Sequence, residues 1–399
     1  MNELVPPLSK SDAQRALVLA DVLGVPFAAL LPPTEALPRD VEVLRDGLLA
    51  LRGATAFIDC RDGGAPFRFL LTQAAVLPGR RVEFTGTPRL GERPHLPLLE
   101  ALRAALGPRG LALTEGTPWP VRVAAPLTLR GPFAFTVGGA QSSQYASSLL
   151  LGAARLSRST GEPVTLTLEG GLTSEGYFAL TKSWLQRTGF SLVTHDATLT
   201  VGAPREAVAF PPIPGDWSSL GYLLALSWVC GLRVARLQFD TGHPDEHLAT
   251  LLREVGLRVT DRLEGEATRG FEVDSEVCPD AIPTLAVLAT KLPGPSVFRK
   301  TGVLRVKESD RLEGTRALLA AAQVPTSLEG DALTVHPHAV LSDFRFDAHD
   351  DHRMAMSAAV LARLHGRKVT LRGMDSVGKS FPSFWVEAAK AQVNVESWT

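Results

Sequence analysis

The segment "DAIPTLAVLATKLPG", residues 280–294, opens on a carboxylate and continues as an almost unbroken apolar run that ends at a glycine. A helix that is hydrophobic on every face must be buried in a protein core. Five further segments have the same form, with a polar cluster, an Ala/Leu-rich run and a Gly at or near its end: residues 9–24, 64–79, 142–156, 216–231 and 351–366. The sequence therefore predicts a repeated unit built around a buried helix.

Most of these helices are followed by a short alternating stretch and then by an amphipathic helix. The stretches "RRVEFTG", "EPVTLTLEG", "LRVARLQFD" and "RKVTLRGM" alternate apolar and polar residues, which is typical of strands. Segments such as "PLLEALRAALG", "DEHLATLLREVG" and "ESDRLEGTRALLAAA" carry charges on one face, and strand pairs such as "GFSLVTHDATLTVG" follow. The predicted unit is buried helix, strand, exposed helix, strand, turn, strand. Six copies fill the chain, and the sixth lacks its last strands.

Length and composition predict a globular protein of two domains. The chain has 399 residues and a formal net charge of −1, so no global field favours nucleic acid or an anionic membrane. Cys60, Cys230 and Cys278 lie far apart and match no zinc or redox motif. Asp21 and Pro26 interrupt the most apolar stretch, and no basic region leads into an apolar run at the start. We expect a cytoplasmic protein that binds neither membrane nor nucleic acid.

The polar clusters all lie where a buried helix begins. Free backbone N–H groups and the helix dipole favour an anion at that end. Several such helix starts facing one cleft would form a polyanion site in a protein without net positive charge. Three copies on each side of the Pro-rich segment "FPPIPGD", residues 210–216, would form two domains with this segment as the linker.

The segment "LRVKESDRLEG", residues 304–314, contains six charged residues among eleven. Taken alone, such a run is most simply a solvated helix face. Each of the other clusters also has a simple structural alternative, such as a helix cap, a turn or a surface charge. The candidates are Lys10, Ser11 and Arg15; Gly64 and Arg68; Arg93; Ser142, Ser143 and Gln144; Ser174 and Tyr177; Asp280; Lys307, Glu308 and Arg311; Asp350, Asp351, His352 and Arg353; and Lys379.

Their shared placement favours a functional site. Eight of these residues are cations, and Asp280 and Glu308 lie among them as carboxylates. This combination suits two substrates that carry several phosphate and carboxylate groups, with a proton transfer between them. Asp350, Asp351 and His352 could suggest a metal, but no second histidine cluster completes a ligand set. We therefore expect no metal and no cofactor.

Six motifs in this order closely resemble the 5-enolpyruvylshikimate-3-phosphate synthase (3-phosphoshikimate 1-carboxyvinyltransferase) family of enolpyruvyl transferases. They are "SKSxxxRAL", "SSQY", "PDAIPTLAVLA", "LRVKESDRL", "DDHRMAM" and "KSFPSF", and the match runs from about residue 8 to residue 387. The resemblance implies an α/β fold of two domains, each with three repeated βαβαββ units and buried helices, an inside-out α/β barrel. It implies one domain of residues 1–8 plus 214–399, another of residues 9–213, and an active site in the cleft between them.

The resemblance also implies the reaction. Phosphoenolpyruvate donates its enolpyruvyl group to the 5-hydroxyl of shikimate 3-phosphate through a tetrahedral intermediate, and phosphate leaves. This is a step of the shikimate pathway to chorismate and the aromatic amino acids, and the target of glyphosate. The implied enzyme acts as a monomer on these two small substrates, without a metal or cofactor.

Roles follow by resemblance at the matching positions. Ser11, Arg15, Ser142, Ser143 and Ser174 would bind shikimate 3-phosphate, with Tyr177 at the edge of that site and Lys10 and Gln144 between the two substrates. Gly64, Arg93, Arg311, Arg353 and Lys379 would bind phosphoenolpyruvate. Asp280 would act as base on the 5-hydroxyl. Lys307 and Glu308 would transfer a proton at the enolpyruvyl carbon, with Glu308 favoured as the donor. Ser309 and Asp310 would serve the start of the following helix.

Three positions depart from the family pattern. Residues 62–67 read "DGGAPF" where the family usually has Asn-Ala/Ser-Gly-Thr, which keeps Gly64 but replaces its neighbours. Val303 stands where some relatives carry an Asn, and Leu8 replaces a Gly before "SKS". These changes bear on the kinetics with phosphoenolpyruvate and on the response to glyphosate, and they leave every charged candidate in place.

Three alternatives have distinct signatures. A UDP-N-acetylglucosamine 1-carboxyvinyltransferase would use a loop cysteine as its acid, but all three cysteines lie outside the loop around Arg93. A non-catalytic ligand-binding relative would have lost acid or base residues, whereas Asp280, Lys307 and Glu308 are present. An RNA 3′-phosphate cyclase would be expected to carry a nucleotide-site histidine motif, and the sequence has none.

Overall fold

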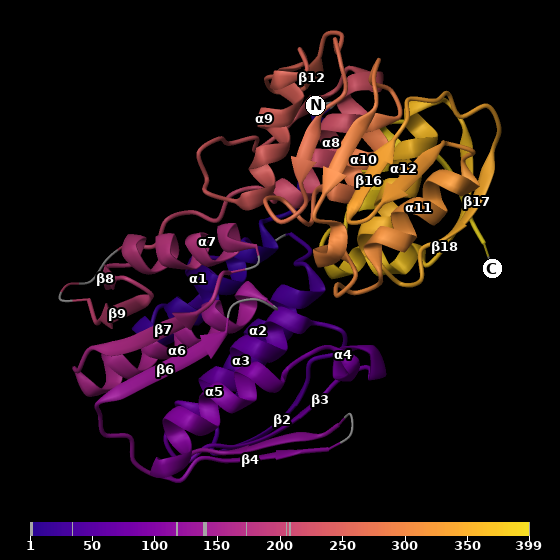
Figure 1. The fold of residues 1–399 in the computed structure, drawn as a ribbon. Helices are drawn as coiled ribbons and strands as arrows, with labels where there is room; N and C mark the ends of the chain where they lie inside the picture. The colour runs from indigo at the N-terminus through magenta and orange to yellow at the C-terminus, as the bar shows by residue number, and fades with distance from the viewer. Residues whose placement is uncertain are drawn as a thin grey trace. The chain divides into compact units, whose positions relative to one another are not determined.

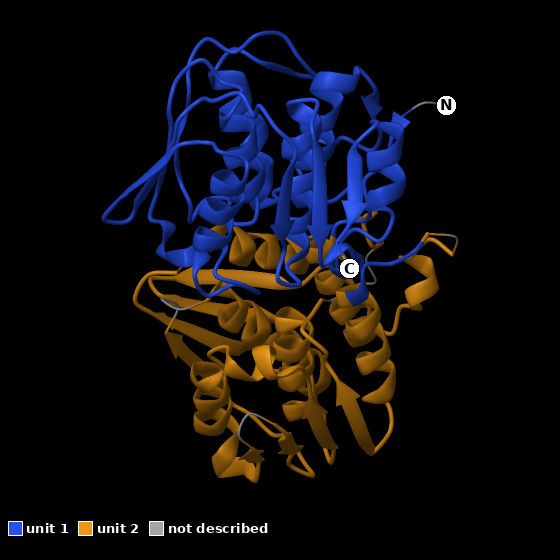
Figure 2. Ribbon diagram, turned by 90° about the vertical axis from the view of Figure 1, so that its right-hand side faces the viewer, with its two compact units in different colours: residues 1–9, 36–39, 214–399 blue, residues 10–35, 40–213 orange. Residues whose placement is uncertain are grey.

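The computed structural model describes residues 3–33, 35–116, 119–138, 142–172, 174–204, 206 and 209–398. It divides into two compact units, coloured in Figure 2. Unit 1 comprises Met1–Ser9, Ala36–Arg39 and Pro214–Thr399, and unit 2 comprises Lys10–Glu35 and Asp40–Ile213. The long third segment of unit 1 begins inside the Pro-rich stretch of residues 210–216.

Unit 2 begins with α1 (Lys10–Leu23), a 3₁₀ turn (Phe27–Ala29) and α2 (Arg39–Ala50), and two complete βαβαββ copies follow (Figure 1). The first copy is β2 (Thr55–Asp59), α3 (Gly64–Ala75), β3 (Arg81–Thr85), α5 (Leu96–Leu106), β4 (Ala112–Glu115) and β5 (Val121–Ala124), with the short α4 (Pro88–Glu92) before α5. The second copy is β6 (Phe133–Gly138), α6 (Ser143–Thr160), β7 (Val164–Glu169), α7 (Glu175–Arg187), β8 (Ser191–His195) and β9 (Thr198–Gly202).

Unit 1 contains one complete copy, one copy with the same element order but strands of only two residues, and one copy that lacks its last strand. The complete copy is β13 (Glu272–Asp274), α10 (Ile282–Ala289), β14 (Ser296–Arg299), α11 (Arg311–Ala321), β15 (Thr326–Glu329) and β16 (Ala332–Val335). Before it come β1 (Glu3–Leu4), α8 (Trp217–Cys230), β10 (Arg233–Val234), α9 (His247–Glu254), β11 (Arg258–Val259) and β12 (Leu263–Glu264). After it come β17 (Phe344–Asp347), α12 (His352–Leu364), β18 (Lys368–Arg372), α13 (Phe384–Lys390) and β19 (Asn394–Ser397).

The complete copies share one sheet topology. Their strand orders are β2-β3-β5-β4, β6-β7-β9-β8 and β13-β14-β16-β15. In each, the first two strands are parallel and the later pairs are antiparallel. A parallel pair needs a crossover, and the buried helices α3, α6 and α10 supply it. The repeat predicted from the sequence is thereby confirmed in these copies.

The buried helices of unit 2 run in the same direction. Arg68 of α3 bonds Gln144 of α6, and one turn later Thr72 bonds Ser148 with the same separation of 76 residues. A constant offset along two packed helices means that they are parallel. Helix α1 joins them, because Asp21 in its last turn pairs with Arg155 of α6 at 2.6 Å. Helices α1, α3 and α6 therefore all begin at one end of unit 2.

The buried helices of unit 1 have the same arrangement. Near their starts, the hydroxyl of Tyr222 in α8 donates to the backbone carbonyl of Arg353 in α12 at 3.2 Å. Just past their ends, Thr290 after α10 lies 2.8 Å from Nε2 of His365 after α12. The starts of α8, α10 and α12 thus also meet at one end of their own unit.

Three details differ from the sequence prediction. The repeat that starts with α1 has only a 3₁₀ turn where a strand was expected between α1 and α2, among the residues described there. The strand expected in "LRVARLQFD" is limited to Arg233–Val234, because Arg236 and Asp240 have positive φ angles that end the extended backbone. The predicted helix from Glu308 begins at Arg311, because the Asp310 side chain caps it by accepting from the Glu313 N–H at 3.1 Å.

None of the described helices is both long and apolar enough to cross a bilayer.

Close packing of α3 against α6 gives a first prediction. A Cβ added at Gly152 of α6 would lie 2.5 Å from Cγ2 of Thr72 in α3. We expect Gly152→Ala to lower the free energy of unfolding by about 1–3 kcal/mol, measured by urea denaturation, because a buried β-branched side chain cannot rotate away. The second change Thr72→Ser, which removes Cγ2 and keeps the hydroxyl, should restore stability.

The matched control is Gly314→Ala in α11. Its new Cβ would meet Met354 at 3.4 Å, an ordinary contact. This variant should gain up to about 1 kcal/mol from helix propensity. Equal stability changes at Gly152 and Gly314 would show that the α3–α6 spacing does not need glycine.

Candidate active site

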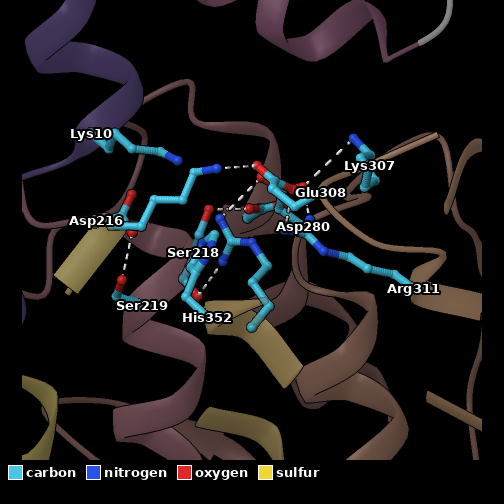
Figure 3. A network of polar contacts seen from close by, with 12 residues as sticks. Lys10, Asp216, Ser218, Ser219, Asp280, Lys307, Glu308, Arg311 and His352 are labelled. Carbon is cyan, nitrogen blue, oxygen red and sulfur yellow. Dashed lines mark hydrogen bonds and ion pairs between the residues drawn. The ribbon is translucent and has the colours of Figure 1, made fainter. Parts of the chain in front are cut away.

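Arg311 lies at the centre of a charged cluster in unit 1 (Figure 3). Its guanidinium donates to three carboxylates: Nε to Asp351 at 2.9 Å, Nη1 to Asp280 at 2.9 Å and Nη2 to Glu308 at 2.5 Å. The Arg311 side chain is 1% exposed, whereas those of Asp280 and Glu308 are 20% and 19% exposed. The cation is thus buried beneath two carboxylates that remain accessible.

Three further cations reach the same carboxylates. Arg353 donates from Nη2 to the second oxygen of Asp280 at 3.0 Å. Lys307 lies 3.6 Å from the first oxygen of Asp280. Lys379 lies 3.5 Å from Glu308 and is almost fully buried. Four cations and three carboxylates, including Asp351, leave this cluster with a formal excess of one positive charge.

The surrounding charges control the protonation of Asp280. Burial opposes its ionisation, but Arg353, Lys307 and Arg311 together hold the pKa of the carboxyl well below its usual value. Burial lowers the pKa of Lys307, and the nearby Arg311 lowers it further although Asp280 opposes both. Asp280 is therefore an anion at neutral pH, and Lys307 is a stronger acid than an exposed lysine.

Helix starts bring these side chains together. Asp280 precedes α10 in the sequence, and Arg311 is the first residue of α11. Asp351 caps α12 by accepting from the Arg353 N–H at 2.9 Å, and it also accepts from the Ser309 hydroxyl at 2.9 Å. The cap thus orients Arg311 and fixes the backbone of Arg353 at once. Sequence reasoning gave Asp351 no such role, and its only signal was a position within "HDDHRMAM".

Arg15 organises the start of α1 in unit 2. Its guanidinium donates to the Thr181 hydroxyl and to the backbone carbonyls of Ser11 and Tyr177, each at 2.8 Å. Burial lowers the pKa of Arg15 to about 10, with Asp12 opposing the shift, so it stays charged at neutral pH. Three predicted residues, Ser11, Arg15 and Tyr177, are therefore brought together at α1 and α7.

The remaining predicted residues of α1, α6 and α7 lie at helix starts. Lys10 pairs with Asp40 of α2 at 3.0 Å. The Ser142 hydroxyl caps α6 by accepting from the Gln144 N–H at 3.2 Å, and Ser143 is the first residue of that helix. Ser174 precedes α7 with a φ of 57°, and its carbonyl accepts from the Tyr177 N–H at 3.1 Å. The start of α6 therefore offers hydroxyl groups together with a helix N-terminus.

Arg93 lies against the first residue of α3. A Cβ placed on Gly64 would be 2.4 Å from Nη1 of Arg93, so only glycine allows this approach. No carboxylate of a described residue lies within ion-pair distance of Arg93, and its buried Nε has no hydrogen-bond partner among them. Arg93 is thus a cation in unit 2 without a carboxylate partner among the described residues.

Some residues that shape the site were missed. Asp40 and Thr181 are the partners of Lys10 and Arg15, and no local pattern marked them. Arg68 was counted as a cation but given no role; it bonds Gln144 and donates to the Pro94 carbonyl at 3.1 Å. These contacts join residues far apart in the sequence, so only the fold reveals them.

Two of the cysteines lie buried, at Cys60 and Cys278. Burial raises the pKa of the Cys60 and Cys278 thiols, so neither is a ready acid at neutral pH. Within the described part of the chain, no group of three or more His, Cys, Asp or Glu side chains is placed to hold a metal ion.

The buried Asp351 carboxylate generates a second prediction. Replacing it in Asp351→Asn should lower the free energy of unfolding by about 3 kcal/mol, because a buried Arg311 loses one partner of its charge. The control is Glu313→Gln in the same helix, which removes an exposed pair with Arg316 and should change stability by less than about 1 kcal/mol. Urea denaturation of both variants measures the difference, and equal effects would contradict the role of Asp351.

Comparisons with known proteins identify the family. The family described as EPSP synthase (3-phosphoshikimate 1-carboxyvinyltransferase) matches residues 38–387. A 3-phosphoshikimate 1-carboxyvinyltransferase from Methanoculleus marisnigri is 34% identical, over 95% of this chain and 88% of its own. A protein with the same name from Methanopyrus kandleri is 31% identical, over 98% of this chain and 96% of its own. Another from Bordetella petrii is 30% identical, over 95% of this chain and 92% of its own.

Solved structures share the fold. EPSP synthase from Acinetobacter baumannii aligns over 98% of this chain and 96% of its own, with a TM-score of 0.70 and 17% identity. An enolpyruvyl transferase from Streptomyces tendae aligns over 98% and 95%, with a TM-score of 0.66 and 16% identity. The predicted two-domain enolpyruvyl-transferase fold is confirmed. The chain belongs to the EPSP synthase (3-phosphoshikimate 1-carboxyvinyltransferase) family.

Proposed function

We propose that the charged cluster around Arg311 in unit 1 and the candidate residues at the helix starts of unit 2 carry out the reaction of the family. That reaction transfers the enolpyruvyl group of phosphoenolpyruvate to the 5-hydroxyl of shikimate 3-phosphate, in the shikimate pathway of aromatic amino acid biosynthesis. The observation that carries the proposal is the Arg311 network, in which the candidate base Asp280 and the candidate acid Glu308 share one buried guanidinium. We further propose a cytoplasmic, monomeric enzyme.

The proposed roles divide by substrate. In unit 2, Ser11, Arg15, Ser142, Ser143, Ser174 and Tyr177 bind shikimate 3-phosphate, and Lys10 and Gln144 lie between the two substrates. Arg311, Arg353 and Lys379 of unit 1 bind phosphoenolpyruvate, as do Gly64 and Arg93 of unit 2. The starts of buried helices and the cations beside them favour phosphate and carboxylate groups.

The chemistry has an addition step and an elimination step. In the addition, Asp280 accepts the proton of the 5-hydroxyl, whose oxygen bonds to C2 of phosphoenolpyruvate while Glu308 or Lys307 protonates C3. In the elimination, C3 returns a proton, the C2–C3 double bond reforms and the C2–O bond to phosphate breaks. The cations stabilise the negative charge that develops on the departing phosphate.

Substrate binding would itself activate Asp280. In the structure, Arg311 and Arg353 hold the Asp280 carboxylate, and they help to depress its pKa. A carboxylate with so low a pKa is ionised but weakly basic. When the anionic groups of phosphoenolpyruvate share these guanidinium groups, their hold on Asp280 weakens and its pKa rises toward neutrality. The base would thus gain strength only when the second substrate is present.

Lys307 and Glu308 have different strengths as proton donors. Lys307 has a lowered pKa, mainly because it is buried, so it gives up a proton more readily than an ordinary lysine. Glu308 contacts both Arg311 and Lys379. For Glu308 to donate, the anionic substrates must draw these two cations away. We favour Glu308 as donor in the substrate complex, with Lys307 assisting.

A direct assay tests the reaction. Purified protein should release phosphate from phosphoenolpyruvate with shikimate 3-phosphate as acceptor and give no release with UDP-N-acetylglucosamine. Glu308→Gln should lower kcat by about 10²–10⁴-fold, because it removes a general acid. The matched control Glu313→Gln, an exposed residue of α11, should stay within about twofold of wild type.

Either of two results would contradict the proposal. Release with UDP-N-acetylglucosamine instead would indicate the sister reaction. If a folded protein binds shikimate 3-phosphate but releases no phosphate with either acceptor, the protein is a binding protein that has lost the phosphoenolpyruvate site.

The contact between Gly64 and Arg93 gives a further prediction. Gly64→Ala should raise the KM for phosphoenolpyruvate by about ten- to a hundredfold, because the added Cβ displaces the guanidinium of Arg93. The KM for shikimate 3-phosphate should change little. Gly107→Ala is the control, since a Cβ there meets nothing within 4 Å. Steady-state kinetics would refute the role of Arg93 if Gly64→Ala left both KM values unchanged.

A further inference from the structure

The loop that carries Arg93 is held at its backbone. It joins α4 to α5, and its middle residue is Pro94. The Pro94 carbonyl accepts from Nη2 of Arg68 at 3.1 Å and also from the Tyr145 hydroxyl. The Arg68 guanidinium in turn stacks on the Tyr145 ring, 5.1 Å from its centroid. A carbonyl with two donors from α3 and α6 fixes the loop on its Pro94 side.

A group of rings holds the other side of the loop. The His95 ring lies 4.7 Å from the Phe67 ring, and the Phe67 ring lies 5.2 Å from that of Trp119, both edge to face. Phe67 also meets Phe84 of β3 at 5.7 Å. Trp119 donates from Nε1 to the Thr87 carbonyl at 2.9 Å, and Thr87 caps α4. We name Phe67, His95 and Trp119 the aromatic anchor.

His95 is held as a neutral ring. Its Nε2 lies 2.7 Å from the Leu90 carbonyl, so this nitrogen carries the hydrogen. Burial, together with the nearby charge of Arg68, lowers the pKa of His95 to about 3, so the ring is uncharged at neutral pH. A neutral ring beside Arg93 does not repel the guanidinium, and it adds no competing charge to the anion site.

The spacing of residues couples the anchor to Arg93. Gly64 and Phe67 are three residues apart in the first turn of α3, so they lie on neighbouring positions of one face. Arg93 and His95 are two residues apart in the loop. The Gly64–Arg93 contact and the Phe67–His95 contact therefore join the same turn to the same loop. Moving His95 off Phe67 would move Arg93 off Gly64.

We propose that the aromatic anchor is a positioning device for the known reaction, which holds Arg93 in its phosphoenolpyruvate-binding orientation before the substrate arrives. The proposal rests on the proposed role of Arg93. An arginine without a carboxylate partner would otherwise sample many rotamers, and only a fraction of them would bind the anion. The apparent affinity falls in proportion to that fraction. The anchor thus acts on the affinity for phosphoenolpyruvate and leaves the chemical step alone.

A double-mutant cycle tests the anchor. His95→Ala and Phe67→Leu should each raise the KM for phosphoenolpyruvate about tenfold, with kcat and the KM for shikimate 3-phosphate within about twofold of wild type. In an Arg93→Gln background, His95→Ala should raise the KM for phosphoenolpyruvate no further, because the group it positions is gone. Phe135→Leu in β6 is the control, since it truncates an equally buried ring that makes none of the anchor contacts, and it should leave this KM unchanged.

The outcomes separate the two proposals. If His95→Ala and Phe67→Leu leave the KM for phosphoenolpyruvate unchanged while Arg93→Gln raises it, the anchor is overturned and the role of Arg93 stands. An equal rise in wild-type and Arg93→Gln backgrounds also overturns the anchor, because the effect is then general loosening. If Arg93→Gln itself leaves this KM unchanged, the assignment of Arg93 to phosphoenolpyruvate fails, and the role of the anchor fails with it.

Discussion

The buried start of a helix is the constraint on which this structure depends. The first backbone N–H groups of a helix have no partner within it, and burial denies them bulk water. Each unit contains three parallel buried helices, so the unpaired N–H groups of all three helices lie at one end of the unit. Capping side chains such as Ser142 and Asp351 accept hydrogen bonds from some of these N–H groups. The N–H groups that remain favour the binding of anions. We propose that each unit binds anions at this end as a consequence of burying its helices.

Arg311 shows how this constraint becomes chemistry. A buried guanidinium must be paired, and its three carboxylate partners include the two residues proposed as base and acid. Asp351 is inaccessible and gives Arg311 its orientation, whereas Asp280 and Glu308 remain partly exposed. The proposed catalytic carboxylates are thus paired with the same cations that are proposed to bind substrate. Substrate binding and activation of the base would then occur together. When phosphoenolpyruvate binds Arg311 and Arg353, their interaction with the Asp280 carboxylate weakens and Asp280 becomes a stronger base.

Arg93 follows a different principle in unit 2. It has no carboxylate partner among the described residues, and its orientation depends on packing around it. Gly64 provides the space, Pro94 the fixed backbone and the aromatic anchor the rigid support. A cation left unpaired in this way keeps its full attraction for a ligand. Ion pairs therefore orient the cations of the Arg311 cluster in unit 1, whereas packing orients Arg93 in unit 2.

The sequence by itself determined the repeat, the buried helices and the residues at their starts. Apolar runs opened by polar clusters are local patterns, and helix burial follows from them directly. Only the tertiary structure decided which residues meet. The pairing of Arg15 with Thr181, of Lys10 with Asp40 and of Arg311 with Asp351 joins positions that no local pattern connects. The lengths of weak strands such as β10 also depended on backbone turns that periodicity does not reveal. The physical reason is that side-chain pairing and pKa depend on distances across the fold, whereas sequence periodicity reports only which face of an element is buried.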